Sequence, residues 1–304
     1  MTEKILIDKL AESVGKVPER ADVIAVRQYS HEDMQRRTKS FLASISEVFR
    51  QSVDRGDWIQ QKDRTLINLP HGSRAIVYHA SGAMKLVTGL NPMDSIFPKM
   101  EDRTVLEKLI TEKARRLDLN RWVGKNESLQ FERIWQIKAQ AMSNNGQISK
   151  PILCRAVGAY RHVVEDLPVW GPASVAIKVA ADGVLDSFIL HIRESTGEVV
   201  DRPEILRPER AAGAITKQLI DMMGKSKISI GEVANPRWMR FGYMNLSKRK
   251  IQRFLAPVFV AGIDIENQEE AQAYLFVASA TEKSFQPLFL DGKEAPLANL
   301  RQSG

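Results

Sequence analysis

Hydrophobic and polar residues alternate most clearly between Cys154 and Ile192. A charged stretch ends in Glu165-Asp166, and a second apolar alternation ends before Asp182-Gly183. An Asp-Gly pair between alternating apolar runs is the strongest short-range signal for a β-hairpin. The segment therefore predicts consecutive antiparallel strands, with turns at Glu165-Asp166 and at Asp182-Gly183.

Three other segments repeat apolar residues every three to four positions, which is typical of a helix with one buried face. The first runs from His31 to Arg50, with Ser30 as its N-cap and Asp33 completing a capping box. The others run from Arg103 to Leu117 and from Pro208 to Met223, the latter ending at Gly224 as a C′ glycine. We expect Ile45 and Leu219 to be core residues of the first and third helices.

Groups of strands follow each helix, and a short strand at 23–29 precedes the first. The expected strands are 58–62, 65–69, 74–79 and 84–87, then 129–141, 152–164, 175–180 and 184–192, then 228–233, 240–245, 254–263 and 273–280. The pattern of one helix followed by three or four antiparallel strands occurs three times. It predicts an α+β fold of repeated units, in which each unit is a helix packed on an antiparallel β-sheet of three to four strands. The expected units are residues 1–98, 99–200 and 201–304.

Composition narrows the class of protein. A chain of 304 residues with 43% hydrophobic and 27% charged residues is typical of a well-packed globular protein of more than one domain, and excludes a disordered chain. The net charge of +7 is modest and spread along the chain, so we expect no nucleic-acid partner. The densest basic run, Lys248 to Arg253, lies at a predicted turn between strands, either solvated or forming a patch that binds phosphate or acid groups.

Cys154 is the single cysteine, which excludes an internal disulfide and a multi-cysteine metal site within the chain. The first 25 residues are amphipathic and charged without an apolar signal core, and no stretch has the length of a membrane span. The expected location is therefore the cytoplasm, with no membrane partner, unless a leader was removed.

Residues that could do chemistry are sparse. The five histidines are His31, His71, His79, His162 and His191, and none lies at helical spacing from another on a predicted helix. His79 and His162 lie at comparable positions of predicted strands, and we interpret them as hydrogen-bonded residues on a solvent face, with convergence on a ligand as the alternative. Cys154 and His162 would be about 26 Å apart along one strand, so they cannot form a catalytic pair. Nucleophile-elbow and glycine-rich phosphate motifs are absent. We expect no catalytic residue, no cofactor and no metal, and an inert buried thiol at Cys154.

Aromatic residues provide the stronger candidates for binding. Period-two alternation places Phe131, Arg133, Trp135 and Ile137 on one strand face, and we interpret Trp135 as core packing. Trp170 and Trp238 lie beside prolines at strand ends. For these two residues, packing in the core and contact with a partner are both possible interpretations. The expected partner- or ligand-binding residues are Trp170, Arg161, His162, Tyr160 and Arg133.

Two motifs carry a resemblance to a known family. Tyr78-His-Ala-Ser-Gly-Ala-Met84, after a Leu-Pro-His-Gly turn, resembles strand turns of the propeptide domains that precede thermolysin- and fungalysin-type metalloproteases. The segment from Tyr160 to Pro172, with Asp182-Gly183-Val184, is similar to a strand of the same propeptides and of PepSY and YycH/YycI-like domains. The resemblance implies a cystatin- or PepSY-like α+β domain that acts as a chaperone, inhibitor or binding module. No His-Glu-x-x-His protease motif accompanies it, so only the domain type carries over.

Two functions follow as hypotheses. The first is a non-enzymatic binding, chaperone or inhibitor-like protein that grips a protein or peptide partner with its sheet faces, with a homo-oligomer left open. The alternative is a cofactor-independent enzyme of the cyclase or isomerase type, with Arg133, Tyr160, Arg161 and His162 in a pocket between helix and curved sheet. A filled helix–sheet interface favours binding, and a deep pocket lined by Tyr, His and Arg favours catalysis.

Overall fold

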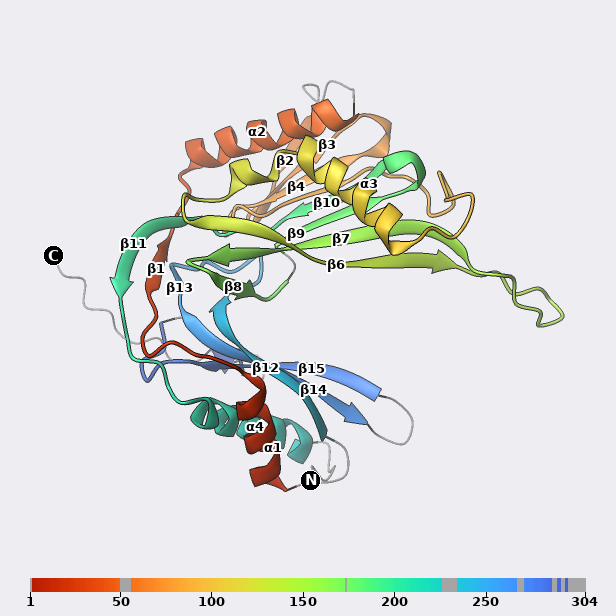
Figure 1. The fold of residues 1–304 in the computed structure, drawn as a ribbon. Coiled ribbons are helices and arrows are strands. Elements are labelled where there is room, and N and C mark those ends of the chain that lie inside the picture. The colour runs from red at the N-terminus through yellow and green to blue at the C-terminus, as the bar shows by residue number, and fades with distance from the viewer. Residues whose placement is uncertain are drawn as a thin grey trace.

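The computed structural model describes residues 2–49, 56–172, 174–225, 234–266, 271–285, 289–290 and 293–294. These residues form two helix-covered sheet layers, one above the other in Figure 1. No helix in these ranges combines the length and the apolar composition needed to cross a membrane.

The first layer is antiparallel, with strand order β6-β7-β9-β10-β5-β4-β3-β2. Two helices, α2 and α3, cover one of its faces (Figure 1). The bounds of these elements are α2 (His31–Phe49), α3 (Arg103–Arg116), β2 (Asp57–Gln60), β3 (Arg64–Asn68), β4 (Arg74–Tyr78), β5 (Met84–Val87), β6 (Glu127–Ala139), β7 (Ile152–Val164), β9 (Val175–Val179) and β10 (Leu185–Leu190).

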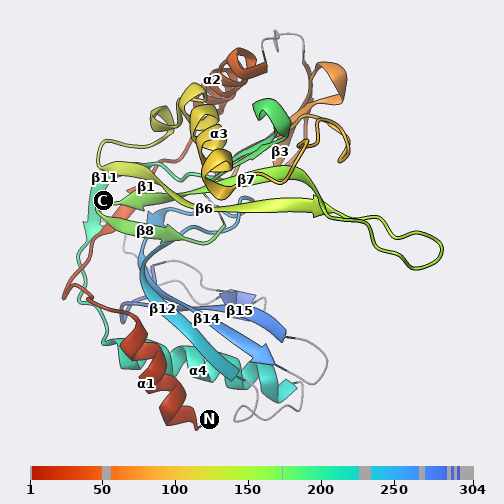
Figure 2. The same cartoon turned by 45° about the vertical axis from the view of Figure 1, so that its right-hand side comes forward.

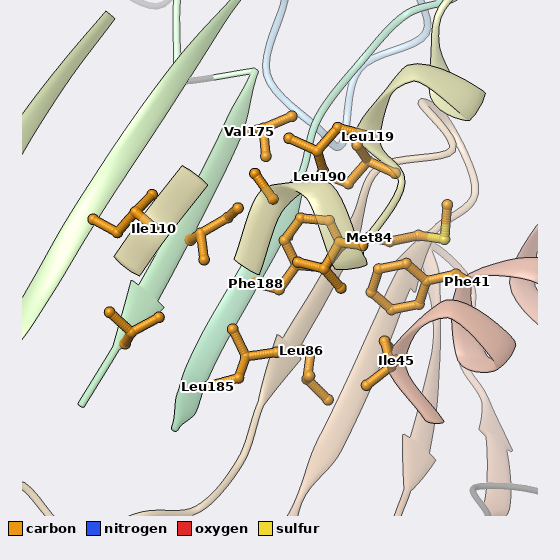
Figure 3. Packing of buried hydrophobic residues seen from close by; sticks show 14 of the residues in the cluster. Phe41, Ile45, Met84, Leu86, Ile110, Leu119, Val175, Leu185, Phe188 and Leu190 are labelled. Atoms are coloured by element: carbon orange, nitrogen blue, oxygen red, sulfur yellow. The ribbon is translucent and has the colours of Figure 1, made fainter. Parts of the chain in front are cut away.

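Apolar side chains fill the interface between these helices and their sheet (Figure 3). Phe41 of α2 stacks on Phe188 of β10, with ring centroids 5.6 Å apart and planes at 15°. Ile110 of α3 packs directly on Gly158 of β7, where an added Cβ would lie 2.4 Å from Ile110 Cγ2. Complete burial of a Leu, Ile or Phe side chain stabilises a fold by roughly 1.5–3 kcal/mol, so this interface is a principal source of stability.

The second layer consists of β12 (Ala234–Met244), β14 (Pro257–Glu266) and β15 (Ala271–Ser279), with α1 (Glu3–Ser13) and α4 (Pro208–Lys225) on one face (Figure 2). Leu6 of α1 and Leu219 of α4 are fully buried against Phe259 of β14 and its neighbours. The amphipathic start of the chain is therefore a helix of this second core.

A short strand, β8 (Leu167–Trp170), joins the two layers. It pairs antiparallel with the end of β7 and parallel with β12, through Val169 opposite Tyr243 and Trp170 opposite Met244. A small sheet beside this junction has the order β11-β1-β13. The remaining elements are β1 (Val23–Val26), β11 (Ser195–Asp201), β13 (Phe254–Leu255), β16 (Phe289–Leu290), β17 (Lys293–Glu294), and the 3-10 helices η1 (Pro70–Gly72), η2 (Leu119–Trp122) and η3 (Ala181–Gly183).

The predicted repeat of one helix on its own small sheet is wrong. In the described part of the chain, both layers belong to one mixed 12-stranded sheet, in which β5 pairs with β10 and β8 pairs with β12. The physical reason is that local patterns fix hairpins between neighbouring strands. Pairing between strands that are far apart in the chain depends on which edges remain free after the hairpins form.

Most local predictions are confirmed. Glu165 and Asp166, both with positive φ (48° and 63°), form the turn between β7 and β8, and Asp182-Gly183 turns β9 into β10. Helix α4 continues through Gly224 to Lys225, so the predicted C′ glycine is wrong. The predicted strand at 228–233 lies outside the described residues.

A β-bulge changes which residues of β6 share a face. Phe131 pairs with Tyr160 and the next pair is Arg133 with Ala159, so the register shifts by one residue between them. Phe131 therefore faces α3, whereas Arg133 and Trp135 face away from it. Trp135 is 40% exposed, and its prediction as a core residue is wrong because the extra residue reverses the alternation.

Candidate anion-binding pocket

A pocket of about 600 Å³ opens beside the first turns of α2. We call it the arginine pocket, because four arginines contribute to its wall. Its lining residues are Arg27, Gln28, Tyr29, Asp33, Arg36, Arg37, Ser40, Arg121, Trp122 and Glu194. They come from the β1–α2 loop, from one face of α2, from η2, and from the segment between β10 and β11.

The start of α2 is fixed by the predicted capping box. Ser30 Oγ accepts a hydrogen bond from the Asp33 N–H at 3.1 Å, and the Ser30 hydroxyl donates to Asp33 Oδ2 at 2.7 Å. Asp33 also pairs with Arg36 at 2.6 Å. Because residues three and four apart share a helix face, Asp33, Arg36, Arg37 and Ser40 all point to the same side.

Arg37 is the buried cation of the pocket. Its side chain is only 9% exposed, and its guanidinium lies 4.9 Å from the centroid of the Tyr29 ring and 5.0 Å from that of Trp122. Nε and Nη2 of Arg37 have no hydrogen-bond acceptor among the residues described. Burial lowers the pKa of Arg37, while Tyr29 and Glu194 act in the opposite direction.

Glu194 provides the carboxylate closest to Arg37, and this carboxylate also contacts Arg27 and Tyr29. Its oxygens lie 3.1 Å from Arg27 Nη1, 3.7 Å from Arg37 Nη1 and 3.1 Å from the Tyr29 hydroxyl, which donates to it. Burial, opposed by Arg37, raises the pKa of Tyr29 to about 12, so the phenol stays neutral. Glu194 therefore offsets only part of the charge on Arg37.

The charges of the lining leave the pocket cationic. Four arginines stand against Asp33 and Glu194, a net charge of +2. Arg36 is 76% exposed at the rim, and Arg121 lies 5.3 Å from the Trp122 ring centroid while donating to Ser44 Oγ. Planar guanidinium groups suit the paired oxygens of a carboxylate or phosphate. The arrangement can therefore bind an oxyanion.

The structure brings together two of the predicted binding residues, Trp170 and Arg161, on the sheet face away from α3. The Arg161 guanidinium lies 5.2 Å from the Trp170 ring centroid and forms hydrogen bonds of 2.8 and 2.7 Å with both oxygens of Glu132. Trp170 stacks on Trp238 at 6.1 Å and donates to the Phe241 carbonyl at 3.1 Å. These groups pair with one another within the chain, and of the Arg161 guanidinium the Nε atom has no hydrogen-bond partner among the described residues.

Tyr160 and His162 lie on the opposite face of the sheet, the face that carries α2 and α3. The Tyr160 ring meets Phe131 edge-on at 5.4 Å, and burial raises the pKa of its phenol. His162 is fully buried beside Glu127, so the reading of His162 as a solvent-face residue is wrong. Consecutive residues of a strand alternate between faces, so Tyr160 and His162 cannot share a pocket with Arg161.

Arg133 lies on the same sheet face as Arg161 but belongs to the neighbouring strand β6. Its guanidinium lies 5.6 Å from the centroid of the Trp135 ring.

The basic run at 248–253 forms the turn between β12 and β13, as predicted, and its Arg249 pairs with Asp63 at 3.1 Å. His79 does not converge with His162, because its Nε2 lies 2.9 Å from Thr65 Oγ1. Cys154 is buried as expected.

Sequence reasoning missed the arginine pocket. The available signal was the pair Arg36-Arg37, one turn after the capping Asp33 on the polar side of the first predicted helix. No pattern along the chain places Trp122 or Glu194 beside that helix, because both residues arrive through the tertiary fold.

No model of a known protein family matches the chain, and no curated protein matches it. The fold is similar to the crystal structure, at 1.45 Å resolution, of an uncharacterized protein from Eubacterium rectale ATCC 33656. The TM-score is 0.50 at 12% sequence identity, over 98% of this chain and 99% of the other. This similarity shows a shared fold, and the resemblance to PepSY and YycH/YycI-like domains stays a prediction.

Proposed function

We propose that this chain is a non-enzymatic binding protein whose arginine pocket takes a carboxylate-bearing segment of a protein or peptide partner. The observation that carries the proposal is Arg37, a buried guanidinium whose nearest carboxylate is 3.7 Å away and shared with Arg27 and Tyr29. A partner carboxylate at the rim would add negative charge to a pocket of net charge +2.

Two features favour binding over catalysis. Apolar side chains fill most of the helix–sheet interfaces, and the pocket of about 330 Å³ that opens between α2 and strands β2 and β3 has no arginine and no carboxylate in its lining. The residues of the enzymatic hypothesis are divided between the two faces of the first sheet, with Tyr160 and His162 on one and Arg133 and Arg161 on the other. A peptide or protein partner suits the pocket better than a small enclosed ligand, because the Arg36 side chain at its rim is 76% exposed.

Fluorescein-labelled octa-glutamate, compared with octa-glutamine, tests the proposal by fluorescence anisotropy. We expect saturable binding of octa-glutamate alone, weakened at least about tenfold by the double variant Arg36→Glu and Arg121→Glu, since each lost charged contact is worth roughly 1 kcal/mol. The single variant Arg36→Gln, at a highly exposed position, should weaken binding less while keeping the circular dichroism spectrum of the wild type.

The matched control carries the same change of net charge elsewhere. Arg207 and Lys217 are exposed on and just before α4, and the variant Arg207→Glu with Lys217→Glu should bind octa-glutamate as the wild type does. Equal losses in the two double variants would show a non-specific effect of net charge and contradict the proposal. Absence of saturable binding to octa-glutamate would contradict it as well.

A further inference from the structure

A second cavity, of about 280 Å³, lies on the face of the first sheet that points away from α2 and α3. Lys85, Ile189 and Ala176 form a row across its floor, because Ile189 of β10 pairs with Lys85 of β5 on one side and with Ala176 of β9 on the other. Pro172 and Lys248 come from segments at the junction of the two layers. The complete lining is Tyr78, Ala83, Met84, Lys85, Pro172, Ala176, Ile189, His191, Ser247 and Lys248.

Hydrogen bonds hold the turn at residues 247–250, which borders this cavity, in place. Ser81 Oγ donates to the Lys248 carbonyl at 2.7 Å. Arg193 Nη2 donates to the carbonyls of Ser247 and Lys250 at 3.1 and 2.7 Å. The cavity is therefore preformed, which lowers the entropic cost of binding a ligand.

Positive charge surrounds the cavity. Its lining includes Lys85 and Lys248 but no carboxylate. Arg193, directly behind it, is 2% exposed, and its hydrogen bonds go to the Asn245 side-chain oxygen and to backbone carbonyls rather than to an acid. Burial lowers the pKa of Arg193 to about 10, which still leaves it charged at neutral pH.

His191 supplies an unsatisfied polar group at the end of the apolar floor. It is 4% exposed, and its Nε2 has no hydrogen-bond partner within the described ranges. Burial, reinforced by Arg193 and Lys248, lowers the pKa of His191 to about 3, so the ring is neutral at physiological pH. A buried polar atom without a partner costs roughly 1–3 kcal/mol, and a ligand that pairs with it would recover part of that cost.

We propose that this cavity is a binding site for a small monocarboxylic acid with a compact apolar body. The apolar body would lie on Ala176 and Ile189. The carboxylate would face the His191 end and Lys248, whose Nζ lies 4.6 Å from the centroid of the Tyr78 ring. The volume is just below the common range of ligand pockets, about 300–1,000 Å³, which favours a medium-chain or single-ring acid over a long lipid. The proposal is independent of the arginine pocket.

Isothermal titration calorimetry with octanoate tests this site, with 1-octanol and octylammonium as probes of the same apolar length. We expect octanoate to bind with one-to-one stoichiometry, at least about tenfold more tightly than 1-octanol, while octylammonium does not bind. Equal affinity for octanoate and 1-octanol, or no saturable octanoate binding at millimolar concentration, would overturn the proposal.

Variants locate the site. Ala176→Phe fills the floor and should abolish octanoate binding, and Lys248→Ala should weaken it about fivefold because it removes an exposed charge. Lys108→Ala, at an exposed position on α3, is the matched control and should leave the affinity unchanged. If Ala176→Phe fails to fold, the octanoate affinity of Lys248→Ala compared with that of Lys108→Ala tests the site. Equal octanoate affinity in those two lysine variants places binding elsewhere and contradicts the proposal.

Discussion

Glu127 Oε2 lies 2.9 Å from Nε2 of His162, and the two side chains are 1% and 0% exposed. The same oxygen accepts the Gly124 N–H at 2.8 Å, and Glu127 Oε1 accepts the Ser195 N–H at 2.8 Å. This carboxylate therefore connects the start of β6 with the end of β7 and the start of β11. Burial alone would raise the pKa of Glu127, but the hydrogen bond and charge of His162 and the two N–H groups lower it to about 2.

The first prediction concerns acid stability. The pKa of Glu127 is lower in the folded state than in the unfolded chain, so its contribution is complete above about pH 4.5 and is lost as the pH falls towards 2. Between pH 5 and pH 2, the free energy of unfolding of the wild type should fall by on the order of 3 kcal/mol more than that of Glu127→Gln. Urea unfolding across this range measures the difference.

Glu112 provides the control for this experiment. Its pKa is also lowered to about 2, through hydrogen bonds from Arg115 and Arg116, but its side chain is 44% exposed. Solvent screens such surface pairs, so Glu112→Gln should keep the acid dependence of the wild type. The same dependence in Glu127→Gln and in the wild type would show that the buried pair does not control acid stability.

Gly158 is predicted to tolerate no side chain. Alanine there would place Cβ 2.4 Å from Ile110 Cγ2 and 3.3 Å from Phe131 Cε2, and overpacking of this kind costs roughly 1–3 kcal/mol. Gly213 lies within α4, where an added Cβ would be 4.0 Å from Ile7 Cδ1 of α1, so Gly213→Ala should gain about 0.5–1 kcal/mol. A double-mutant cycle with Ile110→Ala should show coupling, and additive losses would mean that Ile110 is not the residue that excludes Cβ.

Leu219→Ala should destabilise the protein by about 2–5 kcal/mol, because Leu219 is fully buried between α4 and the second sheet layer. Denaturant unfolding measures this cost. Lys217→Ala, two residues earlier on the exposed side of α4, should change the free energy of unfolding by less than about 0.5 kcal/mol. A loss within experimental error for Leu219→Ala would show that α4 packs through a different face.

A substitution of Trp170 distinguishes a role of this residue in packing from a role in binding. Its ring lies against Gly242, where an added Cβ would be 2.6 Å from Trp170 Nε1, and it stacks on Trp238. Trp170→Ala should therefore lower the free energy of unfolding by about 2–4 kcal/mol while octa-glutamate affinity stays within about twofold. An affinity loss of about 2 kcal/mol or more with unchanged stability would instead identify Trp170 as a binding hot spot.

Local features of this protein were predictable because they depend on neighbours in the sequence. The capping box of Ser30 and Asp33 and the turns at Glu165-Asp166 and Asp182-Gly183 are completed within a few residues. Helical periodicity likewise identified Ile45 and Leu219 as core residues, since the face of a helix follows from its period. Alternation along β6 failed at Phe131, where one extra residue reversed the faces.

Only the tertiary structure determined which distant segments meet. The pairings of β5 with β10 and of β8 with β12 produced one shared sheet in place of repeated units. The arginine pocket depends on Arg37, Trp122 and Glu194, and the second cavity on Lys85, His191 and Lys248, residues far apart in the chain. Sequence patterns report burial and local conformation, whereas a site requires side chains of separate elements to converge, and that convergence is decided by the packing of the whole core.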